Sequence, residues 1–156
     1  MEKELLKQYL ASYRVAVARL EDLRHRRIQL AKTIDPLHGL NYDGMPRAHN
    51  VTDGMDRVVK TLDKLAEIDA ELQRQEHEAK DYAAAILGTL SLLPEGSDSR
   101  RALELRFIDG LTTLDACGKM AVSDRTYWRI YDTALDSLLE FEAVKAIIRE
   151  MEDGRQ

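Results

Sequence analysis

The stretch ALELRFIDGLTTLDACGKMAVSDRTYWRIYDTALDSLL, residues Ala102 to Leu139, decides the fold that the sequence predicts. It predicts three short helices, because a glycine break at Gly110 and a tight turn at residues 120–122 interrupt the apolar pattern. Ser123 is expected to cap the last helix, since a periodic apolar run begins just beyond it. Thr112 is the corresponding candidate for the middle helix. A helix, a turn of about three residues and a second helix form a geometry that seats a helix in the DNA major groove.

The composition favours an all-α protein. Charged residues make up 33% of the 156 residues and aromatic residues only 6%, a profile of long exposed helices. No β-branched run alternates as a strand would. The single cysteine, Cys117, excludes an intramolecular disulfide and a cysteine-based metal cluster. No signal peptide or spanning segment is evident, so we expect a cytoplasmic protein that does not bind a membrane.

The charge distribution permits DNA binding without requiring it. The net charge of −5 argues weakly against a protein that coats nucleic acid without preference. Residues 100–131, however, carry six basic side chains against four acidic ones. Because the local charge matters more than the total, this segment is the candidate contact region.

The N-terminal arm, residues 2–34, carries a heptad stripe that Arg27 interrupts. A helix this long has no core of its own, so its stripe needs a partner helix. The basic run at residues 24–27 is a candidate phosphate contact, although a solvated helix face is the favoured interpretation. The stripe comprises Leu6, Tyr9, Tyr13, Ala16, Leu20, Leu23, Leu30 and Ile34.

The second arm, residues 53–93, has a cleaner heptad with Asp69 and Glu76 on its seam. Buried polar residues there tend to set register or oligomeric state, and the pattern does not fix which of them pair. Two comparable helices joined by one loop predict an antiparallel coiled-coil hairpin. Its spare stripe is expected to form a homodimer or to dock on the C-terminal unit. A turn-rich break at residues 94–98 predicts domains at 1–94 and 95–156.

The loop expected at residues 35–52 is long for a connection between paired helices. His38 and His49 lie within it, but no cysteine or carboxylate pair joins them at ligand spacing, so neither a metal nor a cofactor is expected. The tail, residues 140–156, is expected to continue as an amphipathic helix that packs on the arms or on a second subunit.

The C-terminal segment resembles region 4 of sigma-70-type factors. The resemblance lies in the Leu-Arg-Phe-Ile-Asp-Gly-Leu-Thr opening, a short helix, the Val-Ser turn, and a long last helix that ends Ala-Leu-Asp-Ser-Leu-Leu. It covers about 40 residues and departs from the usual pattern at Ala121, where glycine is common. With the helical arms and the loop Gly44-Met45-Pro46-Arg47, the whole layout is similar to phage and prophage late transcription regulators of the ArpU/RinA type. That resemblance implies DNA binding near phage promoters, as an activator.

Carried onto this chain, the resemblance makes Ser123–Leu139 the recognition helix. Arg125 or Arg129 could read guanine in the major groove, and Ser123 suits a phosphate at the helix N-terminus. The carboxylate of Asp124 either favours the positive helix end, which is the preferred interpretation, or accepts from cytosine N4. Trp128 either contacts DNA or packs on the arm. The expected DNA-binding residues are Ser123, Asp124, Arg125, Thr126, Trp128, Arg129, Lys119, Arg100, Arg101 and Arg106, of which the last four would contact phosphates.

Two function classes follow from the sequence. The first is a dimeric, sequence-specific transcription regulator that binds double-stranded DNA. The alternative is a protein-binding adaptor that acts on RNA polymerase, or a small DNA-recognition subunit of a phage packaging motor. An enzyme is not expected, because no glycine-rich phosphate loop and no Ser/His/Asp or Cys/His grouping can be assembled.

Overall fold

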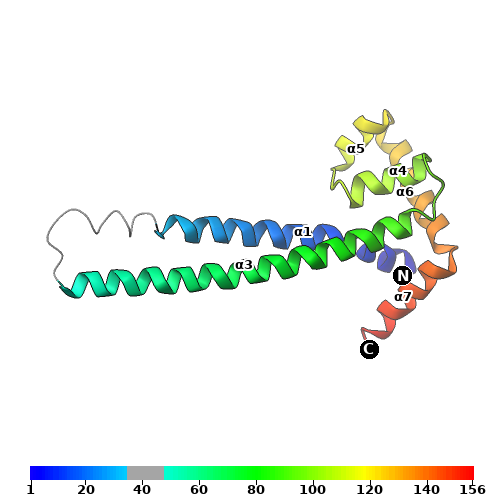
Figure 1. Cartoon of the computed structure of the whole chain (residues 1–156). Helices are drawn as coiled ribbons and strands as arrows, with labels where there is room; N and C mark the ends of the chain where they lie inside the picture. The colour runs from blue at the N-terminus through cyan, green and yellow to red at the C-terminus, as the bar shows by residue number, and fades with distance from the viewer. Residues whose placement is uncertain (35–47) are drawn as a thin grey trace. The chain divides into compact units, whose positions relative to one another are not determined.

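The computed structural model describes residues 1–34 and 48–156, with side chains for residues 1–34 and 54–156 (Figure 1). These residues form six α-helices and no β-strand, which confirms the all-α prediction for the described part of the chain. The loop motif at residues 44–47 and the side chains of His38 and His49 lie outside the described residues. No helix in the described ranges combines the length and the apolarity that a membrane crossing needs.

The chain divides into two compact units. Unit 1 comprises residues 1–16 and 79–156, and unit 2 comprises residues 17–78. Helices α1 (Glu2–Lys32) and α3 (Ala48–Leu90) each contribute to both units. The division between the two units therefore falls within these two helices. Helix α3 also begins at Ala48, so residues 48–52 of the expected loop are helical.

Unit 1 adds four short helices to the ends of α1 and α3. They are α4 (Asp98–Phe107), α5 (Thr113–Met120), α6 (Asp124–Leu139) and α7 (Glu142–Asp153). Their buried side chains share one core with Leu5, Leu6 and Leu10 of α1 and with Ile86, Leu90 and Leu93 from the end of α3 and the turn after it. The first 16 residues therefore belong to the same core as the C-terminal helices.

A hydrogen bond inside unit 1 joins the two long helices. The Tyr9 hydroxyl lies 3.2 Å from Oγ1 of Thr89, which is the one buried polar residue among the described side chains. The Thr89 hydroxyl also donates to the Ala85 carbonyl at 3.1 Å. The buried oxygen is thus satisfied, as packing in an apolar core requires.

Both predicted N-caps of the C-terminal helices are confirmed. Thr112 accepts from the backbone N–H of Asp115 at 3.3 Å, and Ser123 accepts from the N–H of Thr126 at 3.2 Å. Between them, Ala121 ends α5 in the left-handed conformation, with φ 54° and ψ 44°. This turn sets the direction in which α6 leaves α5.

The Ala121→Gly variant is expected to stabilise unit 1 by about 1 kcal/mol, because a Cβ strains the left-handed conformation and glycine removes that strain. Thermal unfolding followed by circular dichroism checks the prediction. Ala121→Val is the matched control and should destabilise, since a β-branched side chain fits this conformation worst. Equal melting temperatures for the glycine and valine variants would contradict it.

The inner face of α5 differs from the expected one. The apolar spacing of the sequence predicts that Leu114 faces the core together with Leu111, Cys117 and Met120, but the Leu114 side chain is 81% exposed. Ala116 and Cys117 make the buried face. At about 100° per residue, Leu114 lies more than a quarter turn from the centre of that face. The expected periodicity was therefore misplaced around the helix, and Leu114 points into solvent.

In unit 2, α1 and α3 lie side by side and antiparallel (Figure 1). Arg24 Nη2 lies 3.1 Å from Glu76 Oε1, and Arg27 Nε lies 2.5 Å from Asp69 Oδ1, so residue numbers rise along one helix as they fall along the other. The charged seam residues that the sequence left unpaired thus meet across the seam. The hydrogen bond from Arg27 lowers the pKa of Asp69 below its usual value.

This pair predicts an acid sensitivity for unit 2. Because the folded-state pKa of Asp69 is depressed, the stability that the pair contributes is present above the ordinary value of 3.8 and is lost as the pH falls through the lowered value. Asp69→Asn should therefore lower the melting temperature at neutral pH and shrink its decline in acid. The control is Glu67→Gln, at an exposed position of α3 in the same unit. Identical acid profiles for wild type and Asp69→Asn would contradict the prediction.

Candidate nucleic-acid interface

The site is the exposed N-terminal end of α6 in unit 1. Ser123, Asp124, Arg125, Trp128 and Arg129 are all exposed there. The Ser123 hydroxyl accepts from the Thr126 N–H and donates to Thr126 Oγ1 at 2.9 Å, so the cap is held in place. The remaining first-turn N–H groups point outward with the positive end of the helix dipole. Asp124, in this first turn, carries the charge that favours a helix N-terminus.

Arg125 and Arg129 are available to a partner. They are four residues apart, so they project from the same side of α6. Neither side chain forms an ion pair or hydrogen bond with another described residue. Arg129 also lines a shallow hollow of about 200 Å³ with residues 98–99 of α4 and with Ile130 and Thr133. A ligand can therefore meet both guanidinium groups without first breaking an internal bond.

Trp128 is neither fully exposed, as a DNA contact would be, nor buried against the arm. Its side chain is 40% exposed. The rest of its indole lies edge-on to the core rings of Tyr127 and Tyr131, with centroids 5.6 Å and 5.1 Å away. Burial raises the pKa of both tyrosines, which keeps their phenols neutral, and the Tyr127 hydroxyl donates to the Ala102 carbonyl at 3.3 Å. Trp128 is therefore held by ring contacts within α6 and stays partly exposed to solvent.

The three arginines of α4 all have internal partners. Arg100 Nε lies 2.7 Å from Glu104 Oε1, and Arg106 Nη1 donates to the Leu111 carbonyl at 3.2 Å. Arg101 Nη2 donates to the carbonyl of Lys119, at the last turn of α5, at 3.3 Å. The side chain of Lys119 is exposed and pairs with no other described residue. Of the four expected phosphate contacts, Lys119 alone has a side chain that forms no hydrogen bond or ion pair with another described residue.

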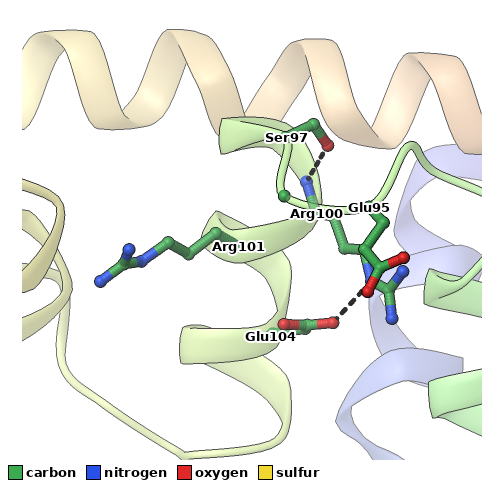
Figure 2. A pocket seen from close by; sticks show the side chains of 6 residues that line it. Glu95, Ser97, Arg100, Arg101 and Glu104 are labelled. Carbon is green, nitrogen blue, oxygen red and sulfur yellow. Dashed lines mark hydrogen bonds and ion pairs between the residues drawn. The ribbon is translucent and has the colours of Figure 1, made fainter.

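Figure 2 shows how the α4 arginines diverge. Arg100 reaches Glu104 on one side of the helix, and Arg101 extends to the other side. Both line a hollow of about 270 Å³ with Glu95, Gly96 and Ser97. Because two carboxylates share that hollow with the two cations, it is not a concentrated positive pocket. The α4 arginines are therefore hydrogen-bonded to other residues of unit 1 and are less available to a ligand than the arginines of α6.

Arg14 is a cation of unit 1 whose position the sequence does not predict. The guanidinium of Arg14, on α1, lies directly against Gly110, where an added Cβ would overlap it. Gly110 has φ 68°, a left-handed conformation that favours glycine, and the flexible end of the Arg14 side chain fills the space beside it. No sequence signal places Arg14 at this loop, because Arg14 is not part of the apolar stripe of residues 2–34.

No protein-family model, curated protein or solved structure matches the chain.

Proposed function

We propose that this chain is a sequence-specific DNA-binding transcription regulator in which α5, the turn at Ala121 and α6 form a helix-turn-helix. The observation that supports it best is the exposed, uncommitted pair Arg125 and Arg129 on the first turns of a capped helix. In such a unit the second helix enters the major groove by its N-terminal residues. The family that fits this proposal is that of sigma-70 region 4-like phage and prophage regulators of the ArpU/RinA type.

Each residue of the α6 end has a role in this proposal. Arg125 and Arg129 would read guanine O6 and N7, contacts worth about 1–3 kcal/mol each. The first-turn N–H groups behind Ser123 would hold a phosphate. Lys119 would contact the backbone as a point charge that positions without specifying. Asp124 would chiefly stabilise the helix N-terminus, and the rim of Trp128 would meet a thymine methyl.

Because the chain is acidic overall, DNA binding in this proposal depends on specific contacts from the N-terminal end of α6. With a net charge of −5, non-specific attraction to DNA is weak. A homodimer, formed through the antiparallel coiled-coil hairpin of α1 and α3, would present two recognition helices. Their half-sites would then lie about one helical turn apart, or a multiple of it.

The test is selection of bound fragments from the source genome, at several salt concentrations and against random competitor DNA. The proposal predicts a few enriched fragments that share a paired half-site, and an affinity that falls as salt rises. Light scattering in parallel separates a dimer from the ring expected of a packaging-motor subunit. Equal recovery of all fragments at every salt concentration would remove the DNA proposal.

A pair of substitutions tests whether Arg101 positions α5 or contacts a DNA phosphate directly. Arg101→Gln should weaken DNA binding by about 2- to 10-fold, because it releases the hydrogen bond that holds the end of α5. Its salt dependence should stay unchanged, since no phosphate contact is lost. Lys119→Gln, the matched control, should instead reduce the slope of log K against log salt by about 0.9. A reduced slope for Arg101→Gln would make Arg101 itself a phosphate contact.

One observation favours a protein partner as the second candidate. Leu114 is a large apolar residue that is 81% exposed on α5, on a helix otherwise packed against α4 and α6. An adaptor that acts on RNA polymerase would use such a side chain at the centre of a small contact. Co-purification with RNA polymerase, without retention on DNA, would favour this candidate over the first.

A further inference from the structure

We propose that Lys3 of α1 is a positioning residue for DNA binding, which keeps Arg129 free by holding two carboxylates on the same face of α6. This inference rests on the proposed function and adds to it a residue from the other end of the chain. Lys3 and α6 belong to the same unit. The Lys3 Nζ lies 2.9 Å from Oδ1 of Asp136 and 3.7 Å from Oδ1 of Asp132.

Four charged side chains form one row along α6. Their positions, 125, 129, 132 and 136, repeat in steps of four, three and four, so at about 100° per residue they fall within roughly 60° around the helix. All four side chains are exposed. The two arginines come first in the row, and Asp132 and Asp136 follow them. The face that the proposed function turns toward DNA therefore continues into a pair of carboxylates.

Lys3 supplies a cation that the C-terminal half of α6 lacks. Asp132 and Asp136 are four residues apart, and like charges at that spacing repel each other. The cationic side chains of α6 are Arg125 and Arg129. Arg129 stands three residues before Asp132, at a spacing that allows an ion pair, whereas Asp136 has no cation of α6 within one turn. Without Lys3, Asp132 would therefore pair with Arg129, the nearest cation of its own helix.

In the structure Lys3 engages both aspartates, and Arg129 forms no ion pair with another described residue. The hydrogen bond to Asp136 raises the pKa of Lys3, so its ammonium group stays charged at neutral pH. The side chains of Lys3, Asp132 and Asp136 keep 33%, 59% and 64% of their surface exposed. Exposed ion pairs add little to the stability of a fold, so the loss of Lys3 should change the charges on this face and leave unit 1 folded.

The experiment is a double-mutant cycle, measured as affinity for the selected DNA site. Lys3→Gln should weaken binding by about 2- to 5-fold, the strength of an exposed ion pair, because Asp132 then competes with DNA for Arg129. In an Asp132→Asn background the same substitution should cost little, since the competing carboxylate is gone. Lys3→Arg should keep the wild-type affinity, because it keeps the charge.

Two matched controls separate this role from a direct contact. In an Asp136→Asn background Lys3→Gln should still weaken binding, because Asp136 lies seven residues from Arg129 and does not compete for it. Lys7→Gln removes an equal charge from α1, where Lys7 pairs with Glu4 of its own helix at 2.8 Å, and it should leave affinity near wild type. An equal loss for Lys3→Gln in the wild-type and both asparagine backgrounds would make Lys3 itself a DNA contact and overturn the inference. An unchanged affinity in Lys3→Gln would also overturn it.

The free protein provides a second readout that needs no DNA. An ion pair slows hydrogen exchange of a guanidinium, so the Nε–H signal of Arg129 in nuclear magnetic resonance, assigned with Arg129→Lys, should exchange more slowly in Lys3→Gln than in wild type. Addition of Asp132→Asn should restore the wild-type rate, and the signal of the exposed Arg149 on α7 is the internal control. Unchanged exchange in Lys3→Gln would overturn the inference. Slower exchange in a chain that selects no DNA would retain the competition for Arg129 and remove the DNA proposal alone.

Discussion

Replacing Leu10 by alanine is expected to lower the free energy of unfolding of unit 1 by about 2–5 kcal/mol. Leu10 has no exposed surface, and it shares a core with the buried residues of α4, α6 and α7. Removal of its isobutyl group leaves a cavity that surrounding side chains fill only in part. The effect should reach the C-terminal helices, although they lie about a hundred residues further along the chain.

The single tryptophan provides the measurement. Trp128 lies on α6 and contacts core tyrosines, so its fluorescence reports the unfolding of unit 1. In urea, the midpoint should fall for Leu10→Ala and stay near wild type for Val15→Ala, whose side chain on the same helix is 49% exposed. An unchanged midpoint at Trp128 would mean that α1 does not belong to the C-terminal core.

The local features of the C-terminal segment were predictable because short-range chemistry sets them. Ser and Thr followed by an apolar run identify N-caps, and both Thr112 and Ser123 cap as expected. The apolar period of α6 likewise places Tyr127, Ala134 and Leu138 in the core. The cap signals extend over three residues and the apolar period over eleven, so both lie within a single helix and its cap.

The tertiary partners of the same segment were not predictable. Arginine patterns do not show that Arg101 and Arg106 donate to the carbonyls of Lys119 and Leu111, because a carbonyl acceptor has no sequence signature. The heptads of α1 and α3 predict a mutual seam but not that residues 1–16 also enter the core of unit 1. A stripe specifies that a face is buried, and it leaves open which neighbour buries it.

The α6 arginines should dominate DNA recognition if the proposed function is right. Arg129→Ala is expected to weaken binding to the selected site by about 5- to 150-fold, the equivalent of 1–3 kcal/mol, and to relax the base preference at one position. Arg125→Ala should act similarly at a neighbouring position. A gel-shift series on the selected site and on single-base variants of it measures both effects.

The control is Arg149→Ala, which removes the same charge from an exposed position of α7 in the same unit. It should change affinity little and base preference not at all, because a distant charge acts only through a screened field. If all three variants weaken binding equally and none relaxes the preference, the arginines supply general attraction and the α6 end does not read bases. The double variant separates the remaining cases. Additive losses mean that the two arginines read different base pairs, whereas a double loss no larger than the greater single loss means that they act on one base pair together.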